Sequence, residues 1–575
     1  MFNSLRNYNY YLIVVIDFLF IILLYKPYLF PLDAIGIFDH DFFLSWQLLI
    51  NDALSDGQIL HWAHHFCGGI PGLANPQSGA LSPYNILGLI INPVMQMKIN
   101  ILIHFFASAV GFIFLTKRMG VSPYFSIIGF VIFGGNGFLL SKILHGQQTF
   151  YPFLYLPILI AFIWPYIAGE KNNTLNFKDI ILGACIVSLI ILEDGFQVLA
   201  YFFTFLFLLS VYPVLIHKKL HIIYIIFLWA IIAIGATFFR LFPIVELLLE
   251  FPRVVYEKDF MSLKMAFDAF FEYDQSSLYE TKIAPHKVWA AYCSFIGWPP
   301  FILSIYVMLN NNTIEVRAML FAALGCLLLM LGHFSSYSPW EILHSLPLFE
   351  NVRAPNRFSS MVILVLSVLS ILAAHFICSN ISLNKPIRVF VIAIIPLSIM
   401  LGYLYSLSPL LEKYKVRLNN IEHGINHDKK YEQILVESQD MYLSIANNKG
   451  IYNCYRALDL PNYSVPVSSI VNDDANIDAT VLPNSIVLNT NLVRPAYIVL
   501  NQNYHKNWKA SGDGNIYQLN SLNRLLAVNV PPGEKTIKLE YIPFAFYDGL
   551  KISIIWCLII LFFIVFKHKR NERLK

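Results

Sequence analysis

The chain has 575 residues, of which 57% are hydrophobic and only 13% are charged. Soluble proteins average roughly 25% charged residues, so this composition excludes an ordinary soluble protein and indicates a polytopic membrane protein. The net charge of +4 is too small to indicate nucleic-acid binding. The seven cysteines have no metal-binding spacing, and only Cys67 and Cys454 clearly lie in loops, so we expect no disulfide framework.

A bilayer-spanning helix requires about 20 largely apolar residues, and about twelve runs of that kind occur along the chain. They fall near residues 9–26, 97–116, 121–143, 149–168, 178–193, 196–216, 221–243, 291–310, 316–332, 356–378, 387–408 and 548–567. Residues 83–94 are also apolar, but they are too short to span and are a candidate re-entrant segment. We therefore expect a polytopic α-helical membrane protein with about twelve spans.

The lysines and arginines between these runs predict orientation, because cytoplasmic connections carry an excess of them. The tail at 567–575 is the strongest basic cluster, and every alternate connection counted back from it contains a basic residue. Both termini of this multi-pass protein are therefore predicted to be cytoplasmic. Three large segments then lie outside the membrane: a first outer loop at 27–96, a loop near 246–287, and the region 408–547.

These segments predict three parts: a transmembrane helical domain at 1–407, an extracytoplasmic β-rich domain at 408–547, and a last transmembrane helix with a basic tail at 548–575. Apolar and polar residues alternate at 497–504 and 535–542, and Gly and Pro mark turns at 512–514 and 532–533. This pattern is typical of antiparallel strands. The chain has no glycine-rich phosphate loop, so nucleotide chemistry is not expected.

The first outer loop contains the most unusual polar segment, at 38–87. Its apolar residues recur at helical spacing from Phe42 to Leu54, and Gly57 suits a helix end, so we expect an amphipathic helix on the outer membrane surface. Asp39 and Asp41 stand at the start of this helix. Each could be a helix cap or, because a helix N-terminus keeps a carboxylate ionised, a general base. We favour Asp41 as the base, with Asp39 close behind.

Other polar residues cluster at predicted outer ends of spans. Glu193 and Asp194 are adjacent acids between apolar runs and should face a cavity or water, although a plain turn explains them equally well. His145 ends another span, and Asn136 lies two turns deeper, where helix packing is its simplest role. We expect the substrate cavity to be lined by these and neighbouring residues, namely His61, His145, Glu193, Asp194 and Gln197.

Arg353 and Arg357 are four residues apart at the outer end of the tenth span, where the distribution of basic residues disfavours them. Snorkelling explains one such arginine, but two are better explained by an anionic partner. A guanidinium matches phosphate oxygens, and Pro355 suits a helix start that adds backbone donors. We therefore predict a phosphate site here, with Arg240 and Arg253 as further candidates.

The three histidines His61, His64 and His65 are the remaining candidates for a site. With Asp39 or Asp41 they could hold a divalent metal, but adjacent histidines seldom ligate one ion together and the spacing matches no known site type. No cofactor is therefore expected, and the metal remains a minor alternative.

Several short motifs occur together in a specific order. They are Asp41, residues 57–62, 69–71, 76–79 and 82–85 in the first outer loop, residues 137–139 with His145, residues 195–197, FENVRAPNRF at 349–358, residues 504–508 and 512–514, VPPGEKTIKLEYIP at 530–543, and Gly549. On these motifs the chain resembles, over nearly its whole length, the YfhO-like bacterial membrane proteins, relatives of the GT-C class of lipid-dependent glycosyltransferases. The chain departs from the family pattern at Phe196-Gln197, where His-Pro-Gln is usual, and at Lys506-Asn507, where Pro-Gly is usual.

The resemblance implies a GT-C-like fold in the bacterial cytoplasmic (inner) membrane and an enzyme that acts on the extracytoplasmic face. Its donor would be a sugar linked to polyprenyl phosphate, and its acceptor an envelope glycan, teichoic-type polymer, lipid or protein. By position, the resemblance assigns the base to Asp41 or Asp39 and the donor phosphate to Arg353 and Arg357. The alternative is a non-enzymatic transporter or lipid-linked glycan assembly protein, which would use the same cavity; a weaker one is a scaffold that binds envelope polysaccharide.

Overall fold

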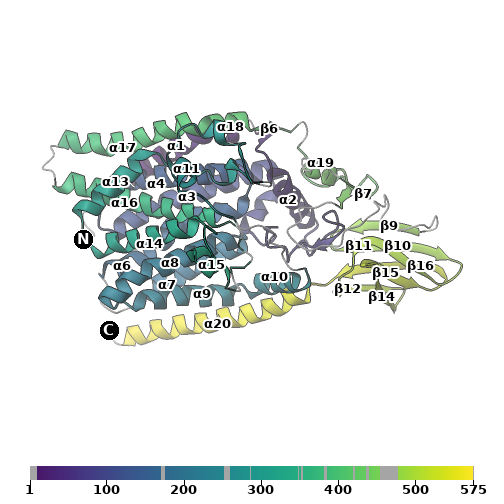
Figure 1. Ribbon diagram of the computed structural model, residues 1–575. Coiled ribbons are helices and arrows are strands. Elements are labelled where there is room, and N and C mark those ends of the chain that lie inside the picture. Colours follow the sequence, from purple (N-terminus) through teal and green to yellow (C-terminus); the bar gives the residue numbers. More distant parts are fainter. Residues whose placement is uncertain are drawn as a thin grey trace.

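The computed structural model describes residues 9–30, 32–169, 175–251, 259–284, 287–346, 349–350, 352, 354–380, 385–418, 421–435, 440–452 and 477–573, with the side chains of 380, 385–392 and 567–573 left aside. A bundle of helices forms most of the molecule, and two β-sheets extend from one end of it (Figure 1). The first and last helices begin and end at the opposite end of the bundle (Figure 1). Several long apolar helices indicate a multi-pass membrane protein.

Among the described residues, seven helices are long and apolar enough to cross a membrane, or up to nine if each of two bent pairs is one span. The seven are α1 (Tyr10–Leu29), α3 (Pro93–Arg118), η4 with α6 (Gln148–Ala168), α8 (Phe196–His217), η6 with α16 (Pro355–Ser379), the end of α17 with α18 (Ala393–Lys413), and the first part of α20 (Phe544–Phe566). The bent pairs are η3 and α4 with α5 (Pro123–Gly135 and Gly137–Leu144, 46°) and α9 with α10 (His221–Ala236 and Phe238–Glu250, 81°).

The prediction of about twelve spans is therefore too high for the described part of the chain. Three predicted spans correspond to short helices: α7 (Phe177–Leu192), α13 (Trp298–Asn310) and α14 (Ile314–Met330), of 16, 13 and 17 residues. Their apolar composition continues through irregular backbone, which hydropathy does not detect. At 291–310, for example, the helix begins only at Trp298, where Pro299 occupies the first turn.

The other elements that make up the candidate spans are η3 (Pro123–Phe125), α4 (Ser126–Gly135), η4 (Gln148–Tyr155), α6 (Leu156–Ala168), η6 (Pro355–Phe358), α16 (Ser359–Asn380), α17 (Lys385–Ser406), α18 (Ser408–Lys413) and α20 (Phe544–Arg573). The remaining helices lie in connections: α2 (His40–Ser55), η2 (Pro83–Leu89), α11 (Leu263–Phe271), α12 (Gln275–Leu278), η5 (Trp289–Ala291), α15 (Pro339–His344) and α19 (Met441–Ala446).

The predicted β region contains two antiparallel sheets. One has the order β13-β12-β16-β10-β9 and the other β11-β15-β14. The strands are β9 (Ile477–Leu482), β10 (Ser485–Leu492), β11 (Ala496–Asn503), β12 (Trp508–Gly512), β13 (Asn515–Tyr517), β14 (Leu519–Leu522), β15 (Leu525–Val530) and β16 (Gly533–Tyr541). Alternate residues of β16, including Ile537, Leu539 and Tyr541, are buried, as the period of two predicted.

The first outer loop and the segment before the sheets form one unit. Short strand pairs join them: β1 (Ala34–Ile35) with β6 (Val416–Arg417), and a bridge from Phe66 to Ile451 beside the parallel pair β7 (Glu432–Ile434) and β8 (Lys449–Ile451). Within the first outer loop, β2 (Trp62–Ala63) pairs with β3 (Ile70–Pro71). Elsewhere, in the loop between α12 and α13, β4 (Lys282–Ala284) pairs with β5 (Lys287–Val288). The domain boundary predicted at residue 408 therefore separates strands that pair with each other in the structure.

Helix α2 is the predicted amphipathic helix, but it does not lie on a membrane surface. Almost all of its residues are buried, including Phe42, Leu44, Trp46 and Leu48 on different sides. Its apolar side chains share a core with α19 and with the start of α3. A helix that is covered on all sides belongs to a protein interior, so the expectation of a surface helix is corrected.

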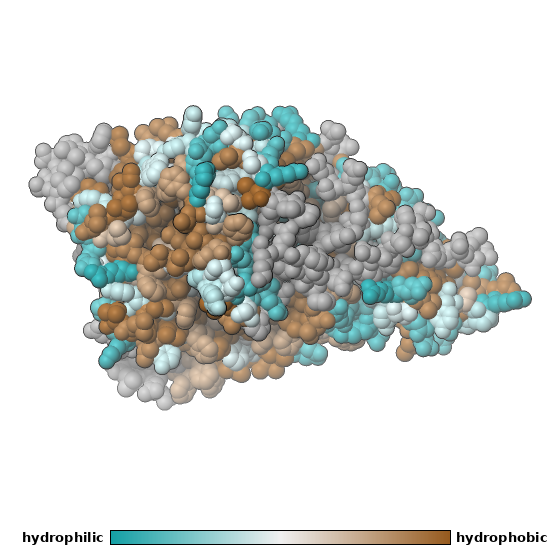
Figure 2. Space-filling model, in the orientation of Figure 1, coloured by the Kyte–Doolittle hydropathy of each residue, from teal (hydrophilic) through white to brown (hydrophobic). Residues whose placement is uncertain are grey.

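Apolar side chains cover the helical bundle, and hydrophilic ones are frequent over the sheets (Figure 2). Helix α20 leaves Ile555, Leu558 and Phe562 more than half exposed. Such a surface is costly in water and is expected for a helix that faces lipid. At its start, α20 packs closely on α10, because a Cβ at Gly549 would meet the Phe238 carbonyl oxygen at 2.5 Å.

Candidate functional site

Asp41 fixes the first outer loop to α19. Its two carboxylate oxygens accept hydrogen bonds from the backbone N–H groups of Met441 (2.8 Å) and Tyr442 (2.9 Å), the first residues of α19. Burial raises the pKa of Asp41 to about 6, although these N–H donors act in the opposite direction. Both oxygens are therefore used in capping a helix that lies 400 residues further along the chain.

Asp194 and Arg240 form a second fixed joint. Arg240 Nε donates to Asp194 Oδ1 at 2.9 Å, and both side chains are fully buried. The guanidinium also donates to the carbonyl oxygens of Leu73 and Asn75, and Asp194 Oδ2 accepts from the Gly79 N–H. This pair therefore holds the Gly/Pro-rich turn of the outer loop against α10 and is not available as a phosphate ligand.

The three histidines bind separate protein partners. His64 Nδ1 lies 3.1 Å from Gln502 Oε1, and His65 Nε2 lies 2.8 Å from Asn448 Oδ1. The His61 ring contacts the ring of Phe546 at the start of α20. Burial lowers the pKa of His61 and His65 to about 4 and that of His64 to about 3, so all three are neutral at pH 7.

No group of three His, Cys, Asp or Glu side chains suited to a metal occurs among the described residues. The histidines instead join the outer loop to the β region. Cys67, two residues after His65 and one of the two cysteines that the sequence placed in loops, is disulfide-bonded.

His145 is a packing residue beside the outer loop. Its ring lies 5.0 Å from the Phe38 ring and stacks on Tyr279, whose hydroxyl is 3.3 Å from His145 Nε2. Burial, together with the nearby Lys142, lowers the pKa of His145 well below its usual value. His145 is therefore a neutral group that positions the start of the outer loop.

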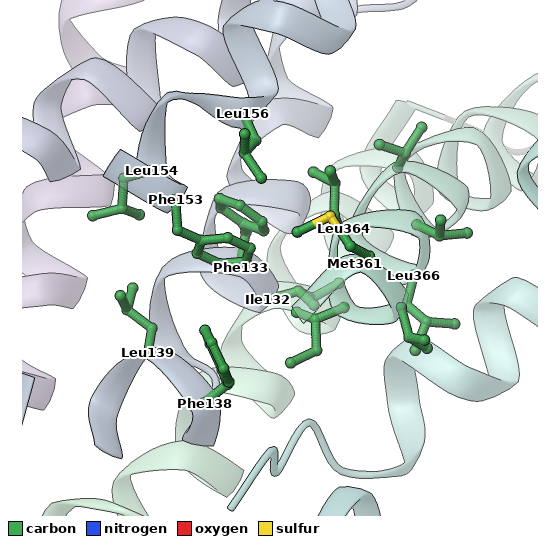
Figure 3. Packing of buried hydrophobic residues seen from close by; sticks show 14 of the residues in the cluster. Ile132, Phe133, Phe138, Leu139, Phe153, Leu154, Leu156, Met361, Leu364 and Leu366 are labelled. Atoms are coloured by element: carbon green, nitrogen blue, oxygen red, sulfur yellow. The ribbon is translucent and has the colours of Figure 1, made fainter. Parts of the chain in front are cut away.

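Helix η4 begins at Gln148, three residues after His145. The remaining candidate residues within the described parts of the chain lie near its start. Its Phe153 ring stacks on Phe133 of α4 at 4.2 Å and meets Phe138 of α5 edge-on. Figure 3 shows these rings together, with Met361 and Leu364 of α16 nearby. Close packing of this kind fixes the backbone of η4, so its first residues are presented from a rigid support.

Asp39 meets the residue before η4. Gln147 Nε2 donates to Asp39 Oδ2 at 2.6 Å, and the Asp39 side chain is half-buried. Asp39 occupies the N-cap position of α2, but its side chain makes no capping hydrogen bond. Gln147 Oε1 is buried and has no hydrogen-bond partner among the described residues. Unlike Asp41, Asp39 thus keeps capacity to accept a proton or a hydrogen bond.

Arg357 of η6, just before α16, meets the same turn. It donates to the side-chain oxygen of Gln197, and its guanidinium carbon lies 4.8 Å from the centroid of the Phe150 ring. Lys142 Nζ lies 5.2 Å from the same centroid. Arg357 and Lys142 therefore both lie against one aromatic ring, whose π-face attracts cations. Arg353, the other predicted phosphate ligand, lies outside the described residues.

Glu193 is held on the other side of η4. Its Oε2 lies 2.8 Å from His104 Nε2, and its Oε1 accepts from the Tyr155 hydroxyl at 3.0 Å. The Tyr155 and Tyr84 hydroxyls are 2.7 Å apart. Glu193 also lines a cleft together with Gln148 and Thr149 of η4. The acid is thus positioned by three aromatic or imidazole side chains and still faces an open space.

The predicted residues therefore fall into two groups. Asp41, His61, His145 and Asp194 are bound within the protein and join its parts. The others lie around the segment 147–150, where the Phe150 N–H donates to the Gln147 carbonyl at 3.0 Å in one turn. Asp39 and Arg357 contact this segment directly, Gln197 binds Arg357, and Glu193 lines the same cleft as Gln148 and Thr149. We call the second group the η4 site; it consists of Asp39, Lys142, Gln147, Phe150, Glu193, Gln197 and Arg357.

Lys142, Phe150 and His104 were missed in the sequence. Lys142 and His104 stand alone in apolar runs, which was a usable signal, because ionisable residues in such runs usually have a function or a specific partner. Phe150 gave no signal, because it is one of 47 phenylalanines.

No protein-family model matches the chain, and a comparison with curated proteins finds no match either. The resemblance to YfhO-like proteins therefore stays a prediction.

Proposed function

We propose that the protein is a membrane glycosyltransferase that moves a sugar from a polyprenyl-phosphate donor to an acceptor hydroxyl on the extracytoplasmic face. The observation that carries the proposal is the meeting of a carboxylate and a guanidinium at one turn. Asp39 binds Gln147, and Arg357 lies on Phe150, three residues further on. Consecutive Cα atoms are about 3.8 Å apart, so a turn of this length brings its two ends within reach of one small substrate.

The chemistry assigned to the η4 site is a single displacement at the anomeric carbon. The Asp39 carboxylate takes the proton of the acceptor hydroxyl, and the acceptor oxygen forms a bond to the anomeric carbon. The bond from that carbon to the phosphate oxygen breaks, and its electron pair leaves with polyprenyl phosphate. The configuration at the anomeric carbon inverts in such a step.

The cations supply the charge that this step requires. The leaving phosphate gains negative charge as its bond to the sugar breaks, and Arg357 and Lys142 lie where they can stabilise it. Gln197 binds the Arg357 guanidinium and thereby sets its direction. No cofactor is assigned to the reaction, and the prenyl chain would lie along the apolar surface of the bundle.

The proposed orientation puts the sheets and the η4 site outside the cell. Two observations support it. The chain ends lie at the end of the bundle away from the sheets (Figure 1), as expected if both termini are cytoplasmic. Cys67 of the outer loop is disulfide-bonded, and disulfides persist mainly in oxidising compartments outside the bacterial cytoplasm. The membrane itself is assigned as the bacterial cytoplasmic (inner) membrane.

One observation favours the alternative, a transporter. The span made by α4 and α5 is broken by 46° at Asn136, and broken helices often bind substrates in transporters. Asn136, however, fills the break by itself: its side chain accepts from the Leu139 N–H and donates to the Phe133 carbonyl oxygen. The break is thus satisfied within the protein, which weakens the transporter proposal.

The test is sugar transfer in membranes that contain the protein, with a set of radiolabelled polyprenyl-phosphate sugars as donors and the envelope fraction as acceptor. We expect one donor to label the acceptor with wild-type protein. Arg357→Gln removes a charged hydrogen bond to phosphate, worth about 2 kcal/mol, and should lower transfer by roughly thirtyfold.

Arg317→Gln is the matched control, because Arg317 is exposed at the start of α14 and lies outside the η4 site. It should transfer sugar like the wild type. Absence of transfer from every donor by wild-type protein, or equal transfer by the two arginine variants, would contradict the proposal.

A further inference from the structure

A polar cleft lies beside the η4 site. It is a small cleft that is partly open to solvent. Four segments form its walls: α2, residues 77–85, the start of α3, and the start of η4 with Glu193. Their side chains are Phe43, Gln47, Gln77, Ser78, Ser82, Tyr84, Asn85, Gln96, Asn100, Gln148, Thr149 and Glu193.

One wall of this cleft is held rigidly by its own amides. Gln47 donates to Asn51 and Asn85, at 3.1 and 3.2 Å. Asn51 in turn donates to Gln96 at 3.0 Å, and Asn85 donates to the Gly79 carbonyl oxygen at 2.8 Å. A hydrogen-bonded network of this kind fixes side-chain positions before any ligand arrives.

The same cleft has further polar groups that the described residues do not bind. Asn100 is 8% exposed, and its side-chain oxygen makes no hydrogen bond to the described residues. The side chains of Gln77, Gln148 and Thr149 likewise have no partner in the described parts of the chain and line the same cleft. A buried polar group without a partner costs about 1–3 kcal/mol, so groups arranged like these are completed by water or by a ligand.

The charge and hydrogen-bonding capacity of these groups indicate which class of ligand fits the cleft. Among the described residues of the lining, Glu193 is the one ionisable acid or base other than tyrosine, and its two oxygens already bind His104 and Tyr155. Amide and hydroxyl groups both donate and accept hydrogen bonds, which matches the hydroxyl groups of a sugar. The rings of Phe43 and Tyr84 offer apolar surfaces for the C–H face of a sugar ring.

We propose that this cleft binds an uncharged monosaccharide unit through Asn100, Gln77, Gln148 and Thr149. The inference rests on the proposed function, because the neighbouring η4 site would then hold the phosphate that carries this sugar. The Glu193 carboxylate repels acidic sugars, and the lack of a second free acid disfavours amino sugars with a protonated amine.

The experiment measures binding directly by saturation-transfer difference NMR on the full chain purified in detergent. The probes are glucose, galactose, mannose and N-acetylglucosamine, with glucuronate and glucosamine as charged comparisons. We expect at least one neutral sugar to bind more tightly than both charged ones. Asn100→Leu should weaken that binding about tenfold, the equivalent of one lost hydrogen bond of about 1.4 kcal/mol.

Asn310→Leu is the matched control, since Asn310 is an exposed asparagine at the end of α13; it should bind sugar like the wild type. Gln148→Ala serves as a second cleft variant if Asn100→Leu fails to fold, and it should also weaken binding. The proposal is overturned if no neutral sugar binds, if a charged sugar binds better, or if the cleft variant that folds binds normally.

The binding and transfer experiments can distinguish failure of the cleft proposal from failure of the proposed function. Binding of a neutral sugar without transfer from any polyprenyl-phosphate donor would support the cleft and contradict the glycosyltransferase. Transfer of an acidic or amino sugar would support the glycosyltransferase and contradict the cleft assignment.

Discussion

The first outer loop contacts the rest of the molecule through two different kinds of surface. At its junction with α10, α19 and the sheets, the carboxylates of Asp41 and Asp194 are fully paired. At the η4 site and the cleft, Gln147 Oε1 and Asn100 Oδ1 are buried without a partner among the described residues. The junction carboxylates are thus bound within the protein, whereas Gln147 and Asn100 keep an unused acceptor oxygen beside the cleft and the η4 site.

The same difference in hydrogen-bond partners distinguishes the two candidates for the general base. Asp39 and Asp41 are two residues apart, and both stand at the start of α2. Asp41 accepts two backbone N–H bonds, while Asp39 accepts one bond from a side chain. Both oxygens of Asp41 are occupied by backbone donors, so Asp41 has a structural role. Asp39 has fewer partners and therefore remains the candidate for the general base. The predictions below test that separation, beginning with the largest expected effect.

Breaking the buried pair at the junction should have the largest effect on stability. Arg240→Met leaves the Asp194 carboxylate buried without its cation and removes the donors to Leu73 and Asn75. Loss of one partner from a buried pair costs roughly 3–5 kcal/mol, and we expect the free energy of unfolding to fall by that amount. The measurement is denaturant unfolding of the purified protein in detergent.

The double variant Arg240→Met with Asp194→Leu provides the control for that prediction. It removes both charges together, so part of the lost stability should return. Unfolding of Arg240→Met at wild-type denaturant concentration would show that the pair does not hold the junction.

Asp41 should make stability depend on pH. Burial raises its pKa in the folded protein to about 6 from the usual 3.8, so the folded state binds the proton more tightly than the unfolded state does. Its favourable contribution is fully present below pH 3.8 and is lost as pH rises through about 6. The free energy of unfolding of the wild type, relative to Asp41→Asn, should therefore fall between pH 4 and 6.

The comparison with Asp41→Asn removes the effect of every other titrating group. A difference between the two proteins that does not change across this range, or that grows with pH, would contradict the raised pKa of Asp41.

The exposed ion pairs of the same junction should contribute least to the free energy of unfolding. Lys506 Nζ lies 3.0 Å from Glu246 and 2.6 Å from Glu250 of α10, but the lysine side chain is 58% exposed. Exposed pairs contribute about 0–1 kcal/mol, so Lys506→Ala should change the free energy of unfolding by less than about 1 kcal/mol. A loss of stability comparable with that of Arg240→Met would show that the junction is stabilised mainly by the ion pairs of Lys506 and not by the buried pair.

The sequence predicted the helices well because each apolar run forms a helix at nearly the expected place. The number of spans was overestimated because composition does not show where a helix stops; α14, for instance, ends two residues before Gly332, which has a positive φ of 71°. The periodicity of α2 predicted a helix correctly. Its burial depends on α19, which lies some 400 residues away, so the covered face was not visible in the sequence.

The candidate site was predictable as a set of residues but not as a geometry. Arg357, Gln197, Glu193 and Asp39 were all selected from the sequence, and the structure brings each of them to η4. The sequence favoured Asp41 over Asp39 as the base, and the proposal reverses that preference, because the N–H donors that occupy Asp41 belong to α19 and were not visible in the sequence. It also could not reveal Phe150 as the shared contact of two cations.

The central claim is that Asp39 is the base of a sugar transfer, and a paired comparison of Asp39→Asn with Asp41→Asn in the membrane transfer assay tests it most directly. Removal of a general base lowers rates by about 10²–10⁴-fold. We predict a loss of that size for Asp39→Asn with unchanged unfolding, and at least half of wild-type transfer per folded molecule for Asp41→Asn. Normal transfer by folded Asp39→Asn would contradict the account.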